Sequence, residues 1–131
     1  MSPASAGADP CPCGSGANYA GCCGRWHSGP QQWQAPTAEA LMRSRYSAYV
    51  RELGGYLQDT WHPSTRPAAP PVFEPGLRWL GLEVRRHTPL GDDRAEVLFV
   101  ARSKLGGRAH RLQECSRFVR EAGRWYYVDG D

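Results

Sequence analysis

Four cysteines near the start of the chain form two close pairs, Cys11 with Cys13 and Cys22 with Cys23. Four thiolates can surround a zinc ion tetrahedrally at Zn–S distances of about 2.3 Å. Glycines between the two pairs let the backbone turn tightly and direct amide N–H groups at the sulfurs. The spacing therefore predicts one structural zinc ion held by all four thiolates, with no open coordination position.

Other interpretations of these cysteines remain open: disulfides between the pairs, a redox thiol, or an iron–sulfur centre. The first ten residues lack the basic and apolar regions of a secretory signal, and no stretch approaches the roughly 20 apolar residues of a membrane span. We therefore expect a cytoplasmic protein without membrane contact, whose thiols stay reduced and favour metal. His27 is the nearby substitute ligand, but we expect it to face solvent because four thiolates suffice.

The segment CPCGSGANYAGCCG, residues 11–24, resembles the SEC-C motif, a short zinc-binding element. The motif reads CPCGSG, then a tyrosine, then C[CH]G, and Tyr19 stands at the tyrosine position. The resemblance implies a zinc module and does not by itself imply an activity.

Downstream, the pattern predicts two helices followed by strands. Thr37 can cap a helix from Ala38 to about Leu53, and Gly54-Gly55 is expected to end it. A short second helix is predicted from Tyr56 to about Trp61. Apolar residues of the long helix recur every three or four positions and form one stripe: Leu41, Met42, Tyr46, Tyr49, Val50 and Leu53.

Alternating apolar and polar residues, separated by glycine-rich turn signals, predict four antiparallel strands. Their expected bounds are Arg78 to His87, Arg94 to Lys104, His110 to Arg120 and Arg124 to Asp129. Helices before strands indicate an α+β fold. We expect the twisted sheet to wrap around the long helix and leave a concave side.

Four further segments resemble the YchJ family of uncharacterised bacterial proteins: LMRSRYSAYV, TWHPSTRP, SRFVRE and GRWYYVDG. The resemblance implies a domain similar to nuclear transport factor 2, a cystatin-like cone, behind an N-terminal SEC-C module. From this resemblance, together with the composition along the chain, we expect a flexible N-terminus (1–10), the zinc module (11–24), a linker (25–36) and the cone (37–131). The resemblance implies no activity.

A pocket in such a cone would draw on side chains from the long helix, the end of the second helix and the last two strands. On the third strand, period two places Glu114 and Ser116 on one face. On the last strand, Trp125, Tyr127 and Asp129 are expected to share a face. The pocket candidates are Arg43, Tyr46, Trp61, His62, Glu114, Ser116, Tyr127 and Asp129.

The favoured function is binding, of a small ligand in the cone or of a protein through the zinc module. The first alternative is an isomerase-, dehydratase- or hydrolase-like enzyme in which Glu114 or Asp129 acts as a base with His62 as its partner. In a structural role, Glu114 would instead pair with Arg43 or Arg45.

The second alternative is nucleic-acid or ribosome-associated binding. The net charge of +3 is too small to argue for it alone. Arginines on the outer sheet face, with two tryptophans for stacking, would form the surface: Arg102, Arg111, Arg117, Arg120, Trp26 and Trp33. The outer sheet face can also form a homodimer, and the fifth cysteine, Cys115, is expected to be a small packed residue.

Overall fold

The computed structural model describes residues 9–131, so most of the segment 1–10 that was predicted to be flexible lies outside the described residues. The N-terminal part holds two short helices, η1 (Tyr19–Gly21) and α2 (Gly24–His27). The rest of the fold consists of α3 (Ala38–Val50), α4 (Gly54–Asp59), β1 (Arg78–Pro89), β2 (Arg94–Leu105), β3 (Arg108–Glu121) and β4 (Arg124–Gly130).

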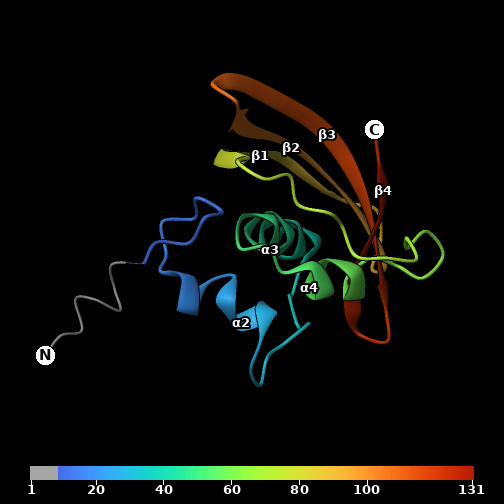
Figure 1. Ribbon diagram of the computed structural model, residues 1–131. Coiled ribbons are helices and arrows are strands. Elements are labelled where there is room, and N and C mark those ends of the chain that lie inside the picture. The colour runs from blue at the N-terminus through green and yellow to red at the C-terminus, as the bar shows by residue number, and fades with distance from the viewer. Residues whose placement is uncertain (1–8) are drawn as a thin grey trace, which may run out of the picture.

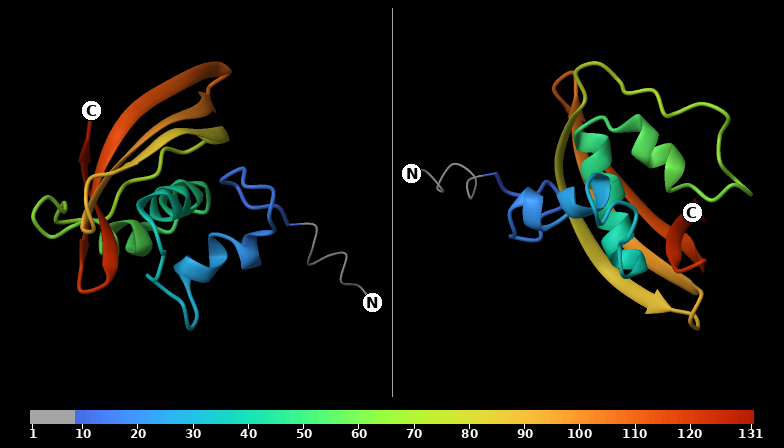
Figure 2. Two further views of the ribbon diagram at one scale, coloured as in Figure 1. Left: turned by 180° about the vertical axis from the view of Figure 1, so that it is seen from behind. Right: turned by 90° about the horizontal axis from the view of Figure 1, so that it is seen from below.

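The four strands form one antiparallel sheet in the order β1-β2-β3-β4. The sheet curves over α3, and the helices lie on its concave side (Figures 1 and 2). Two-residue turns, Gly106-Gly107 and Ala122-Gly123, join the last three strands, and both have positive φ at each central residue. Such turns match the right-handed twist of the flanking strands. The predicted α+β class and curved antiparallel sheet are confirmed.

The helix α3 starts as predicted but ends three residues early. The Thr37 hydroxyl accepts a hydrogen bond from the Ala40 amide at 3.0 Å and caps the first turn. Glu52 follows the helix with a φ of 57°, so it takes the left-handed conformation that usually ends a helix. The expectation that Gly54-Gly55 ends the long helix is wrong, because these glycines begin α4 instead. None of the helices within residues 9–131 is long and apolar enough to cross a membrane.

A β-bulge in β4 changes which side chains face the helix. Arg117 pairs with Asp129, but the neighbouring Phe118 pairs with Tyr127, so Val128 is an extra residue in the ladder. The extra residue turns Asp129 to the outer face, where its carboxylate lies 2.6 Å from the Arg117 guanidinium. The prediction that Asp129 shares a face with Tyr127 is therefore wrong.

The free edge of β4 is covered by the chain that follows α4. The Tyr127 amide donates to the Thr60 carbonyl at 2.9 Å, and the His62 amide donates to the Tyr127 carbonyl at 2.7 Å. This pairing brings Trp61 against the Tyr127 ring, with centroids 5.0 Å apart. The end of α4 thus forms part of the wall between α3 and the sheet.

Candidate functional site

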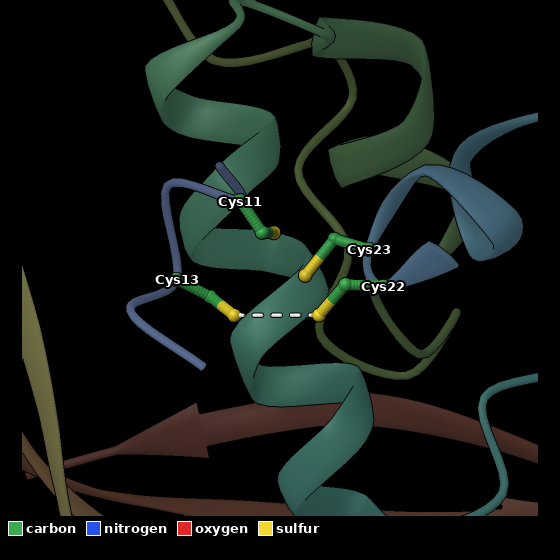
Figure 3. Close-up of side chains that lie close together, drawn as sticks. All are labelled: Cys11, Cys13, Cys22 and Cys23. Atoms are coloured by element: carbon green, nitrogen blue, oxygen red, sulfur yellow. Dashed lines mark hydrogen bonds between the residues drawn. The ribbon is translucent and has the colours of Figure 1, made fainter. Parts of the chain in front are cut away.

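The four N-terminal cysteines meet at one point beside α3 (Figure 3). Their four Sγ atoms all lie within 4.8 Å of one another. The Cys13 and Cys22 sulfurs are 3.7 Å apart, close to the roughly 3.8 Å edge of a tetrahedron with 2.3 Å metal–sulfur bonds. All four are free thiols, since a disulfide requires sulfurs about 2.05 Å apart. The predicted ligand set is brought together with spacing that fits a tetrahedral metal ion.

The surroundings of these thiols also suit a bound cation. Cys11, Cys13 and Cys23 are buried, and hydrogen bonding to Cys11 and Cys13, together with burial, raises the pKa of Cys23. Four thiolates this close cannot all ionise unless a cation offsets their charge. Hydroxyl groups add weaker contacts, with the Ser15 oxygen 3.1 Å from the Cys22 sulfur. The cluster can therefore hold a divalent metal ion.

The cysteine segment is docked on α3, with Leu82 of β1 also packed against it. Arg43 donates to the Cys13 carbonyl at 3.0 Å and pairs with Glu39 at 3.0 Å. The Arg51 guanidinium lies over the Tyr19 ring at 4.0 Å. Arg43, a pocket candidate, thus fixes the cysteine segment and does not line the cone cavity.

His27 forms the deepest contact between the two parts. It is buried, and its Nε2 donates to the Ser44 carbonyl of α3 at 2.8 Å. Because Nε2 carries the hydrogen, Nδ1 accepts from the Tyr19 hydroxyl at 2.5 Å. Burial lowers the pKa of His27, which favours the neutral ring. The expectation that His27 faces solvent is wrong, because the residues expected to be a linker pack against α3.

A cavity of about 310 Å³ lies between α3 and the concave face of the sheet. Most of its wall is aromatic or aliphatic, with polar groups gathered near β3 and β4. Five of the eight pocket candidates line it: Tyr46, Trp61, Glu114, Ser116 and Tyr127. The other lining residues are Met42, Arg45, Tyr49, Trp79, Phe99, Ala101, Leu112 and Phe118.

Glu114 is the carboxylate of this cavity. It accepts hydrogen bonds from the Ser116 hydroxyl at 2.6 Å and from the Tyr127 hydroxyl at 3.3 Å. Gly130, opposite Ser116 on β4, leaves the space that the carboxylate fills, since a Cβ there would overlap it. Burial, with the nearby charge of Glu114, raises the pKa of Tyr127 to about 12, so its hydroxyl stays protonated and donates.

Arg45 is a cavity residue that was not among the sequence-based pocket candidates. Only 6% of the residue is exposed, and its Nη1 donates to the Leu57 carbonyl at 2.8 Å and to the Thr60 hydroxyl at 2.6 Å. Its guanidinium carbon lies 4.7 Å from the centre of the Tyr127 ring. Arg45 stands three residues after Met42, within the apolar stripe of the helix, and this position was the signal available in the sequence.

The remaining two pocket candidates lie outside the cavity. His62 is held by the Ser64 hydroxyl at 2.7 Å and the Glu121 carboxylate at 2.9 Å. Asp129 is paired with Arg117 on the outer face. The acid–base pair of the enzymatic hypothesis is therefore not assembled, because neither His62 nor Asp129 is beside Glu114.

The arginines and tryptophans proposed for nucleic acid are mostly engaged within the protein. Arg117 binds both Asp129 and Asp131. Trp26 is buried, and the guanidinium of Arg25 covers its ring at 4.4 Å. These contacts leave fewer free cations and rings for a nucleic acid than the sequence alone indicated.

Comparison with known proteins places the fold and the cysteine cluster in a family. Residues 37–130 match the family model described as YchJ, middle NTF2-like domain, and residues 8–25 match the SEC-C motif. A UPF0225 protein of Methylibium petroleiphilum is 64% identical over 122 residues, which cover 93% of this chain and 88% of that protein. A UPF0225 protein of Bordetella pertussis is 54% identical over 121 residues, covering 92% and 91%.

Two solved structures are similar over most of their length. The solution structure of RPA3114, a SEC-C motif containing protein from Rhodopseudomonas palustris, has a TM-score of 0.79 at 34% identity and covers 92% of this chain and 96% of that one. The crystal structure of a SEC-C motif containing protein from Psychrobacter arcticus has a TM-score of 0.76 at 31% identity, covering 95% and 82%. The chain therefore belongs to the YchJ family, with a SEC-C motif ahead of a domain similar to nuclear transport factor 2.

Proposed function

We propose that this protein binds a small ligand in the cone cavity, with an apolar body among the aromatic rings and a polar end at Glu114 and Arg45. The observation that carries the proposal is the cavity of about 310 Å³, which is apolar along most of its wall and polar at one end. Ligand sites in proteins are typically concave and apolar with a few placed polar groups, and span about 300–1,000 Å³. The volume suits a molecule of one or two rings.

The metal-binding segment has a structural role in this proposal. The four thiolates of Cys11, Cys13, Cys22 and Cys23 suit zinc, and a metal with four protein ligands has no open position for a substrate. Bound zinc would crosslink the N-terminal segment, which contacts α3 through the Cys13 carbonyl, bound by Arg43, and through His27, which binds the Ser44 carbonyl. Such a thiolate site is expected in the reducing cytoplasm.

A fluorinated neutral probe tests ligand binding directly. Para-fluorobenzyl alcohol has an apolar ring and one hydroxyl, and its fluorine NMR signal reports binding by broadening and shift during a titration with protein. Saturable binding is expected. Ala101→Leu adds three carbons at a cavity-lining, 4% exposed position and should weaken binding, because the added volume competes with the probe.

Ala109→Leu is the matched control, since Ala109 is exposed on β3 and does not line the cavity. This control should bind the probe as the wild type does. Equal weakening by both substitutions would reject a ligand site in the cone, as would failure of the wild type to bind this alcohol and also a carboxylate and an amide of similar size.

A further inference from the structure

Arg45 lines the cavity, and one edge of its guanidinium has no partner among the described residues. Both hydrogens of Nη1 are committed, to the Leu57 carbonyl and the Thr60 hydroxyl. Within residues 9–131, Nε and Nη2 have no hydrogen-bond partner, and no carboxylate lies within 4.0 Å of them. These two nitrogens form the side of the guanidinium that pairs with both oxygens of a carboxylate.

The rest of the wall holds this edge in place. The guanidinium carbon lies 4.7 Å from the Tyr127 ring centre and 5.3 Å from that of Trp61, so two aromatic faces orient it. A buried cation without an ionic partner is costly, and a bound anion would remove that cost. The anchored Nη1 leaves the guanidinium little freedom, so a ligand would lose little entropy in ordering it.

We infer that the cavity ligand is a small monocarboxylate with an aromatic or similarly flat apolar body, whose carboxylate is bound by Nε and Nη2 of Arg45. This inference rests on the proposed ligand-binding function and specifies its chemical class. The flat body would lie among Tyr46, Trp79 and Phe118, which line the apolar part of the cavity. Glu114 carries the competing negative charge and limits the affinity for any anion.

Glu114 provides the main alternative, in which its carboxylate is the permanent counter-ion of Arg45. In the structure the Glu114 oxygen is instead bound by Ser116 and Tyr127, and the two charges interact only at longer range. If Arg45 awaits an external carboxylate, removing the Glu114 charge strengthens binding of that carboxylate. If Glu114 neutralises Arg45, the same change leaves the cation unpaired and weakens the fold.

The test compares para-fluorophenylacetate with para-fluorophenylacetamide, which has nearly the same shape but no charge. Fluorine NMR titrations should give an affinity about ten- to a hundredfold higher for the carboxylate, since hydrogen bonds between charged groups contribute more than neutral ones. Arg45→Lys should remove most of this preference, because an ammonium cannot form the two parallel hydrogen bonds. Arg102→Lys is the control, since Arg102 lies on the outer sheet face and pairs with Glu83. This variant should keep the preference for the carboxylate over the amide.

Glu114→Gln keeps the inference testable if Arg45→Lys fails to fold. It should raise the affinity for the carboxylate several-fold and leave that for the amide unchanged. Equal affinities for carboxylate and amide in the wild type would overturn the inference, while binding of para-fluorobenzyl alcohol would still support a ligand site. Failure of all three probes to bind would reject the ligand site itself.

Discussion

The imidazole of His27 is buried between the cysteine segment and α3, and its Nε2 lies 2.8 Å from the Ser44 carbonyl oxygen. Tyr19, from the loop between the cysteine pairs, donates to the other ring nitrogen. The Ser44 hydroxyl in turn accepts from the Tyr56 hydroxyl at 2.7 Å, since it donates its own hydrogen to Leu41. A series of hydrogen bonds therefore runs from the cysteine segment through Ser44 of α3 to α4.

Replacing His27 should destabilise the whole protein. His27→Phe keeps a ring of similar width but removes both hydrogen bonds, which leaves the buried Ser44 carbonyl without this donor and the half-buried Tyr19 hydroxyl without its acceptor. The expected loss is about 1–3 kcal/mol in the free energy of unfolding, measured by denaturant titration in buffer that contains zinc. His110→Phe, at an exposed position of β3, is the control and should change little. If the His27→Phe protein is as stable as the wild type, the hydrogen bonds of His27 contribute nothing to stability.

Removing the metal should lower the stability of the cone as well as that of the N-terminal loop. The N-terminal segment contributes the Cys13 carbonyl that Arg43 binds, the Tyr19 ring that Arg51 covers, and His27, which binds Ser44. These contacts depend on a segment held in shape. When free zinc is a thousandfold above the dissociation constant, its binding contributes about 4 kcal/mol to the free energy of unfolding, and removing the zinc loses this contribution. Thermal unfolding, followed by tryptophan fluorescence with and without chelator, measures this. An unchanged melting temperature would instead indicate that the cysteine segment is a separate module that does not stabilise the cone.

The buried tyrosines should make the protein less stable at high pH. Burial is the largest cause that raises the pKa of each of Tyr46, Tyr56 and Tyr127 to about 12. In the unfolded chain they ionise near the ordinary value of about 10, so the unfolded state releases protons first. The stability from this difference is complete below pH 10 and declines as the pH rises toward 12.

Ultraviolet absorbance of tyrosinate checks this directly. Folded protein should show a part of its tyrosines titrating late, and Tyr127→Phe should reduce that late fraction. A single titration near the ordinary pKa for every tyrosine, in protein that is still folded, would disprove the predicted shifts.

The contact between Gly130 and Glu114 should not tolerate a side chain. Gly130→Ala places a methyl group where the Glu114 carboxylate lies, so the carboxylate must leave its position beside Ser116 and Tyr127. Overpacking of this kind costs about 1–3 kcal/mol, measurable by denaturant titration. Gly81→Ala is the matched control on β1, where an added Cβ meets no atom within 4 Å. Equal stability of the two variants would mean that Glu114 moves aside freely.

The sequence was sufficient to predict most of the fold, for physical reasons that differ between elements. The four cysteines were predictable because metal ligands impose their own spacing. The strands were predictable because the alternation of apolar and polar residues and the turn residues are local signals. The ends of each predicted strand lie within two residues of the observed ends. The start of α3 was predictable from its Thr37 cap.

Features that depend on tertiary packing were not predictable in the same way. The bulge at Val128 has no strong local signature, and it alone moves Asp129 to the outer face. A charged residue such as arginine is normally expected at the surface. Arg45 was therefore not predicted to line the cavity, although it lies within the apolar stripe of α3. His27 was expected to face solvent because four thiolates suffice to bind the metal. The acceptor that His27 binds in the interior, Ser44, is 17 residues away in the chain, so no local pattern indicated it.

The most direct test of the central claim, that the cone cavity is a ligand site, is to locate a bound probe. Nuclear Overhauser effects between para-fluorobenzyl alcohol and isotope-labelled protein identify the side chains that the ring contacts. If the cavity binds the probe, contacts are expected to the cavity residues Tyr46, Phe99 and Phe118. Contacts only to residues outside the cavity, such as Arg117 on the outer face, or no contacts at saturating probe, would contradict the claim.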